Sequence, residues 1–181
     1  MSVNMSSYAG ANNDWHMVDA LLQRIDDLRV QFNQSQEIAQ IEAQAALNIS
    51  VHAMKNGEWE RIDRMLHRLS MLGHEFYENK KIAEIDAKTS AGISQYAAKS
   101  GDWQRSNQLL IRLDLLSSRI QNNDKIALAK SNAIFAICYF SSAIEDWEKI
   151  DIMFRQFDGL RSQFPKNTEI ATCEAEIAFI I

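Results

Sequence analysis

The four tryptophans of the chain stand at equal intervals, and this spacing constrains the fold more than any other feature. Trp15, Trp59, Trp103 and Trp147 follow one another at 44 residues each time. When the chain is written in rows of 44 residues, further positions agree without a gap. Each Trp follows an acidic residue, and a leucine stands 13 residues after it in every row. The sequence therefore predicts an internal repeat of 44 residues.

Within each row the apolar residues recur at helical spacing. They fall 7, 10, 13 and 17 residues after the Trp, which is the recurrence of one face of an α-helix. This pattern predicts a first helix over about 58–77 in the second row. Polar turns follow, and second helices are expected over about 37–55, 81–99 and 125–143. Gly57 and Gly101 are expected to end two of these second helices, so each row forms a helical hairpin.

One such hairpin cannot bury its apolar faces alone, whereas stacked hairpins share a continuous core. Composition agrees, because six glycines and one proline in 181 residues are too few for a turn-dense β-fold. We therefore expect an all-α protein, an α-solenoid of stacked antiparallel hairpins. The expected organisation is a single domain over 1–181, with a partial leading helix at 1–13, full repeats at 14–57, 58–101 and 102–145, and a truncated last repeat at 146–181.

Residues 91–116 (AGISQYAAKSGDWQRSNQLLIRLDLL) resemble a tetratricopeptide (TPR) hairpin. They share a small residue in mid-helix, Ser94, a Gly-Asp turn, and an aromatic residue directly after the turn. The resemblance implies a right-handed solenoid of about four TPR-like repeats. The period of 44 residues exceeds the 34 of ordinary TPRs, so both helices should be longer. HEAT-like repeats share the longer period and are the alternative, but the Gly-Asp-Trp turn and the scarcity of proline favour TPR-like repeats.

Nothing in the sequence predicts catalysis. It has no phosphate-binding glycine loop, no nucleophile elbow and no HExxH motif. The histidines have no metal-ligand spacing; they are His16, His52, His67 and His74. We therefore expect no enzyme, no metal and no cofactor. Cys138 and Cys173 are offset by about 13 Å along stacked helices, too far for a disulfide, and are expected to be buried.

Charge and hydropathy disfavour two further classes of partner. The net charge of −5 disfavours binding to nucleic acid or to an anionic membrane surface. The N-terminal residues lack the features of a signal peptide, so a cytoplasmic location is expected. The most apolar window, residues 126–144, carries Lys130 and Asn132 in its body. It is therefore expected to be a buried helix and not a membrane span.

The tryptophans allow two interpretations. Exposed rings at regular spacing could stack on a ligand, as in proteins that bind single-stranded nucleic acid. We expect core residues instead, because each Trp follows a turn at a fixed place in the apolar face, where a large ring can wedge between neighbouring helices.

The TPR resemblance implies which residues face the concave groove, because the second helix of each row corresponds to the first helix of a TPR hairpin. The partner-binding positions carried over in this way are Gln44, Leu47, Val51, Met54, Lys88, Gln95, Lys99, Asn132, Phe135 and Tyr139. The lysine and asparagine with which some TPR proteins clamp a C-terminal carboxylate are absent. The remaining wall suits an apolar peptide or an amphipathic helix. Whether Phe135 and Tyr139 line the groove or belong to the core stays open.

These observations predict a protein-protein interaction scaffold that binds a protein or peptide partner. The alternative is a self-assembling structural module or a fragment of a larger helical-repeat protein. Residues 177–181 form an apolar patch, which would favour a homo-oligomer through the C-terminal helix. A nucleic-acid-binding helical repeat is a third class, disfavoured by the net charge.

Overall fold

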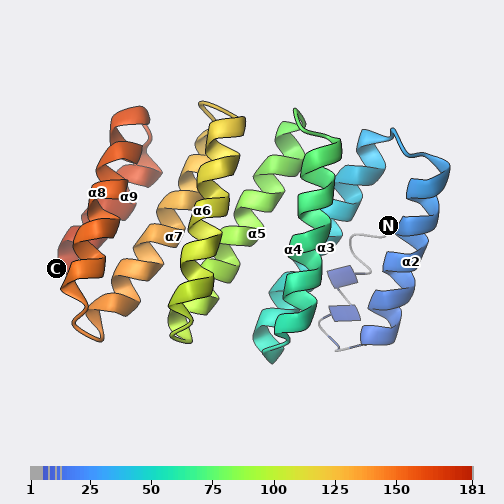
Figure 1. Ribbon diagram of the computed structural model, residues 1–181, viewed down its shortest axis with the longest axis horizontal. Coiled ribbons are helices and arrows are strands. Elements are labelled where there is room, and N and C mark those ends of the chain that lie inside the picture. The colour runs from blue at the N-terminus through green and yellow to red at the C-terminus, as the bar shows by residue number, and fades with distance from the viewer. Residues whose placement is uncertain (1–5, 8, 11, 13, 181) are drawn as a thin grey trace. The chain divides into compact units, whose positions relative to one another are not determined.

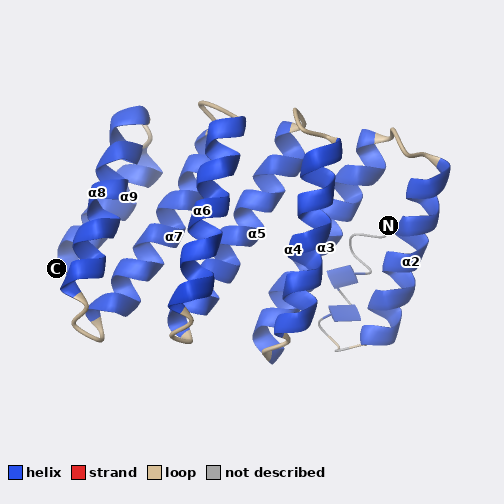
Figure 2. Ribbon diagram, in the orientation of Figure 1, coloured by secondary structure: helices blue, strands red, loops and turns tan. Residues whose placement is uncertain are grey.

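The computed structural model describes residues 6, 7, 9, 10, 12 and 14–180, and within them the protein is all-α (Figures 1 and 2). Eight helices and no strand are found in these residues. The helices are α2 (Trp15–Gln31), α3 (Gln36–Asn56), α4 (Trp59–Glu75), α5 (Lys80–Lys99), α6 (Trp103–Arg119), α7 (Asp124–Ser142), α8 (Trp147–Gln163) and α9 (Thr168–Ile180). The predicted all-α class is confirmed, and the predicted helices lie within two residues of the observed ones.

The Trp-led helices α2, α4, α6 and α8 have the same length, 17 residues, and start in the same way. Asp14, Asp102 and Asp146 each accept a hydrogen bond from the backbone N–H three residues on, at 3.0 to 3.1 Å. These carboxylates satisfy a donor that the first helical turn would otherwise leave unpaired. Glu58 makes no such bond, and its carboxylate instead binds Arg61 at 2.9 Å.

The residue before each second helix has a short polar side chain that caps the N-terminus of the helix. Each cap accepts a hydrogen bond from the backbone N–H three residues on; the caps are Ser35, Asn79, Asn123 and Asn167. The polar turns of the sequence therefore act as predicted. They stop one helix and supply the cap of the next.

The chain divides into two compact units, unit 1 (Met1–Thr89) and unit 2 (Ser90–Ile181), with the boundary inside α5. In unit 1, α3 packs against α2 and α4 (Figure 1). Its core includes Leu22, Ile49, Met65 and Leu69. In unit 2, α7 packs against α6, α8 and α9. A single solenoid over 1–181 stays a prediction.

Unit 2 buries both cysteines. Cys138 on α7 and Cys173 on α9 are buried free thiols, as the sequence predicted. Burial raises the pKa of Cys138 to about 11, so its thiol is protonated at neutral pH and a poor nucleophile. Within the described residues, no helix combines the length and apolarity needed to cross a membrane.

The predicted leading helix at 1–13 lies largely outside the described residues. Of those described, Ser6 and Ala9 are buried, and the Asn48 side chain donates to the Ser6 hydroxyl at 3.5 Å. Gly10 packs so closely on α3 that a Cβ there would lie 2.7 Å from the His52 ring. A larger residue at this position would force the His52 side chain to move.

The interpretation of the tryptophans as buried core residues is wrong. Trp15, Trp59 and Trp103 are half-buried, and Trp147 is 52% exposed. Each ring sits on the first residue of its helix, at the end of a hairpin, so it covers the core instead of filling it. The Arg61 guanidinium lies over the Trp15 ring at 4.5 Å, and the Lys149 ammonium lies over the Trp103 ring at 4.1 Å.

The turn before each Trp-led helix yields the first prediction. Gly57 and Gly101 adopt left-handed φ angles of 70° and 78°, and Glu145, at the corresponding turn, has φ 58°. A non-glycine residue pays a steric cost in this conformation. Glu145→Gly should therefore raise the free energy of unfolding by about 0.5–1 kcal/mol, measured by urea denaturation.

The reciprocal substitution is the control. Gly101→Glu should lower the free energy of unfolding by about 1 kcal/mol. A Cβ at Gly101 meets nothing within 4 Å, so the loss would report the backbone angle and not a clash. If both substitutions change stability in the same direction, the explanation is wrong.

Candidate functional site

The predicted partner-binding residues of unit 1 lie on α3 and α5 with different exposures. Val51 is 38% exposed, and Gln44 and Met54 are partly exposed. Lys88 is exposed on α5. Leu47 is only 8% exposed and belongs to the core cluster of unit 1, so it offers almost no surface to a partner.

In unit 2, Phe135 and Tyr139 lie together on α7 and help to form an apolar groove. Their ring centroids are 6.2 Å apart, and Tyr139 is 50% exposed. An edge-to-face contact at 5.1 Å between Tyr139 and Phe140 holds the tyrosine ring. Both predicted residues therefore line a surface groove, although Phe135 is partly covered.

The opposite wall of the groove comes from α9, which the sequence reasoning had not assigned to a site. It contributes Thr172, Ala175, Glu176, Phe179 and Ile180, and the groove has a volume of about 390 Å³. The spacing of three and four residues was visible in the sequence and places these residues on one helix face. Phe179 is 92% exposed, so the apolar wall continues to the rim of the groove.

The other predicted residues of unit 2 are polar and partly engaged within the unit. Gln95 on α5 donates to the backbone carbonyl of Asn132 on α7 at 3.4 Å. The side-chain oxygen of Asn132 accepts a hydrogen bond from the Cys173 thiol at 3.5 Å, so Asn132 links α7 to α9. Lys99 is exposed at the end of α5.

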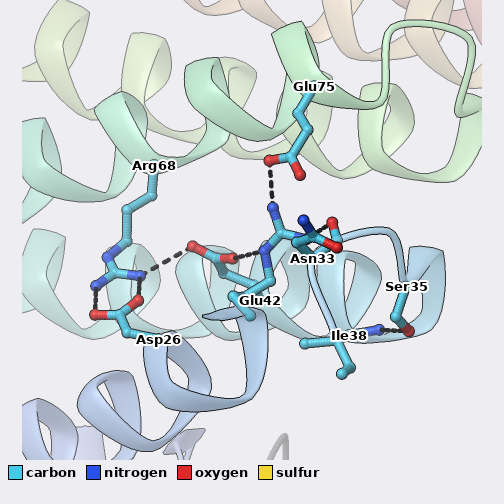
Figure 3. Close-up of polar contacts among 8 residues, drawn as sticks. Asp26, Asn33, Ser35, Ile38, Glu42, Arg68 and Glu75 are labelled. Atoms are coloured by element: carbon cyan, nitrogen blue, oxygen red, sulfur yellow. Dashed lines mark hydrogen bonds and ion pairs between the residues drawn. The ribbon is translucent and has the colours of Figure 1, made fainter. Parts of the chain in front are cut away.

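A network of charged side chains connects the helices of unit 1 (Figure 3). The sequence analysis did not predict that these residues come together. Arg68 on α4 makes two hydrogen bonds of 2.7 Å to the Asp26 carboxylate on α2. It also binds Glu42 on α3 at 2.9 Å. Arg29 on α2 lies 3.4 Å from the other Glu42 oxygen and also pairs with Glu75 on α4. The network therefore ties all three helices together.

Glu42 is the buried centre of this network, with 6% of its surface exposed. Burial raises the pKa of the Glu42 carboxyl above its ordinary value, and the positive charges and hydrogen bond of Arg68 and Arg29 oppose the shift only in part. A buried carboxylate is tolerated because two guanidinium groups face it. The arrangement is structural, because each Glu42 oxygen is occupied by one of the two arginines.

Unit 2 holds a second, polar pocket of about 410 Å³. Lys130 on α7 lines it and binds Asp114 on α6 at 2.5 Å. Ser117 also lines it, and the Ser117 hydroxyl oxygen is buried without a hydrogen-bond partner. Asp114 and Lys130 neutralise each other, so the pocket has no excess charge from this pair.

Among the described residues, no three histidine, cysteine or acidic side chains gather closely enough to hold a metal ion. In comparisons with known proteins, the chain matches no family model, no curated protein and no solved structure. The inference of function therefore rests on the geometry of the chain itself.

The ion network predicts unequal roles for two arginines on α4. Arg68→Ala should lower the free energy of unfolding by about 3 kcal/mol, because Glu42 stays buried with only Arg29 to neutralise it. Arg64→Ala is the matched control. The Arg64 side chain is 48% exposed and lies 3.7 Å from Asp19, so its loss should cost less than about 0.5 kcal/mol. Equal losses in urea melts would contradict a structural role for the network.

Glu42 also predicts a pH dependence. Its carboxyl holds a proton more tightly in the folded state than in the unfolded chain. This contribution to stability is fully present below the ordinary pKa of 4.5 and is lost as the pH rises through the folded-state pKa. Glu42→Gln removes it. The wild-type protein should therefore exceed the Gln variant in unfolding free energy by more at about pH 4 than at about pH 7. A difference that stays constant across this range would refute the prediction.

Proposed function

We propose that the protein is a non-catalytic, TPR-like helical-repeat module that binds an amphipathic helix of another protein in the groove between α7 and α9. The observation that carries this proposal is the groove itself, whose walls expose Tyr139 by 50% and Phe179 by 92%. Exposed aromatic rings that face one another across a groove are typical of surfaces that take an apolar helix face.

The TPR-like part of the proposal is supported by the regularity of the helices. The four Trp-led helices have equal lengths and start 44 residues apart, and so do the starts of the four second helices. In each unit, a basic side chain covers the Trp that lies 46 residues before it, Arg61 over Trp15 and Lys149 over Trp103. Equal local contacts at equal sequence intervals are expected of one hairpin repeated along the chain.

Acidic side chains on α9 indicate which residues should flank the apolar stripe of the proposed partner helix. Glu176 lines the groove, and Glu169 is exposed near the start of the same helix. Neither carboxylate has an ion-pair partner in the part of the chain that the structure describes. A partner helix with an apolar stripe and basic flanking residues would match both the apolar walls and these acids. The acidic net charge of the chain favours the same partner.

The test uses two helical peptides of about 18 residues with the same leucine stripe, flanked by lysine in one and by glutamate in the other. Fluorescence anisotropy should show the lysine-flanked peptide bound with a Kd on the order of 10 µM, and the other at least about tenfold more weakly. Tyr139→Ser or Phe179→Ser should each weaken binding about tenfold, because each removes an exposed apolar wall.

A matched control comes from the same unit. Leu115 on α6 is 66% exposed but does not line the groove, so Leu115→Ser should leave the affinity unchanged. Glu176→Lys should reverse the preference between the two peptides. If neither peptide binds, or if Leu115→Ser weakens binding as much as Phe179→Ser, the proposed site is wrong.

A further inference from the structure

One arginine that binds two acids crosses the contact between the hairpin α2–α3 and helix α4 in unit 1. Arg68 on α4 binds Asp26 on α2 through two hydrogen bonds of 2.7 Å and binds Glu42 on α3 at 2.9 Å (Figure 3). Asp26 and Glu42 belong to one hairpin, α2–α3, and Arg68 belongs to the next. Arg68 therefore joins one hairpin to its neighbour through an acid pair.

The hairpin α8–α9 carries the same acid pair. Asp158 and Glu174 stand 132 residues after Asp26 and Glu42, three times the interval between the tryptophans. Arg161 binds Glu174 at 2.8 Å, and the corresponding residue of unit 1, Arg29, lies 3.4 Å from Glu42. Asp158 is exposed, and its carboxylate has no ion-pair partner among the described residues.

The arginine that would complete this contact also exists, on α2. Arg24 stands 44 residues before Arg68, is exposed, and forms no ion pair in the described part of the chain. Helix α2 therefore presents a free guanidinium at the position from which Arg68 binds the acid pair of its neighbouring hairpin. The exposed Arg24 guanidinium and the exposed Asp158 carboxylate, which lies beside the half-buried Glu174, are complementary in charge.

We propose that two copies of this chain associate head to tail, with α2 of one copy docked on the α8–α9 hairpin of the other and Arg24 bound between Asp158 and Glu174. This surface is distinct from the groove between α7 and α9. The association joins two different faces, so each copy keeps one free face of each kind and chains of copies can grow.

An exposed aromatic ring stands about three turns before Asp158 on α8, on the same side of the helix, and fits this occupant. Trp147 on α8 is 52% exposed, whereas Arg61 covers the Trp15 ring and Lys149 covers the Trp103 ring. Met17, which is half-buried against the core of its own unit, stands 44 residues before Arg61, so in the proposed register it comes nearest to the Trp147 ring of the other copy. A methionine sulfur against an indole ring is a favourable contact.

The experiment measures the mass of the full chain by light scattering and sedimentation velocity from about 5 to 500 µM at about 50 mM salt. We expect the mean mass to rise continuously with concentration and to fall again at about 500 mM salt. Arg24→Glu and Asp158→Arg should each weaken association about tenfold or more, because each places like charges together. Lys80→Glu, a charge reversal at an exposed residue that starts α5 and belongs to none of α2, α8 and α9, should leave association unchanged.

Mixing provides the decisive arm. Neither Arg24→Glu nor Asp158→Arg should assemble alone, but an equal mixture should, because the intact Arg24 of the Asp158→Arg variant meets the intact acid pair of the Arg24→Glu variant. Growth beyond a pair of copies then requires the introduced glutamate to meet the introduced arginine. Circular dichroism checks that each variant stays helical, and Arg24→Gln with Asp158→Asn repeats the test without reversed charges. A wild-type chain that stays monomeric throughout overturns the proposal. Association that survives both reversals overturns it too.

These outcomes are separable from those for the groove. Tyr139→Ser should weaken peptide binding about tenfold and leave the mass distribution unchanged. Asp158→Arg should do the reverse. Loss of both activities in either variant would mean that one surface serves both purposes, and would overturn the proposal of a separate self-association face.

Discussion

The burial of the second helices α3 and α7 on several sides at once is the constraint on which the rest of the structure depends. In unit 1, α3 packs against both α2 and α4, and its buried residues are spread around most of its circumference. Neighbouring helices approach closely on several sides only where side chains are short, and the buried residues of α3 and α7 are largely alanine, serine and isoleucine. This is why α7 is the most apolar stretch of the chain without being a membrane span.

A charged side chain on such a buried helix needs an oppositely charged side chain beside it. The two units supply this partner in different ways. Glu42 on α3 faces Arg29 and Arg68, whereas the corresponding residue of α7 is Lys130, which binds Asp114. The position of Arg29 corresponds to Ser117 in unit 2. A serine is too short to fill the space that a guanidinium fills in unit 1, which accounts for the polar pocket beside Lys130 and for the unpartnered Ser117 hydroxyl.

The sequence predicted the helices closely because two independent signals agreed, the helical period of apolar residues and the capping residues at each turn. The sequence predicted the exposure of side chains less well. Helical periodicity shows which face of a helix is apolar, but not whether a neighbouring helix covers that face along its whole length. Trp147 lies on the apolar face of α8 and is still half exposed. On a helix that is apolar nearly all round, the pattern does not separate groove from core either. Leu47 was assigned to the groove by resemblance and lies in the core, whereas Tyr139 stayed ambiguous and lines the groove. The α9 wall was missed because the resemblance supplied no positions there.

Helix α9 contributes to both proposed surfaces, and helical geometry explains how they stay separate. Glu174 and Glu176 are two residues apart, which turns their side chains by about 200° around the helix axis. Glu174 accordingly meets Arg161 of α8, and Glu176 lines the groove with α7. The groove offers mainly apolar area, whose burial is little affected by salt, whereas the acid pair acts through charge, which salt screens within about 10 Å at 0.1 M. Ionic strength is therefore expected to weaken the proposed contact at the acid pair more than the proposed contact in the groove, where it acts only on the preference that Glu176 and Glu169 give for a basic partner.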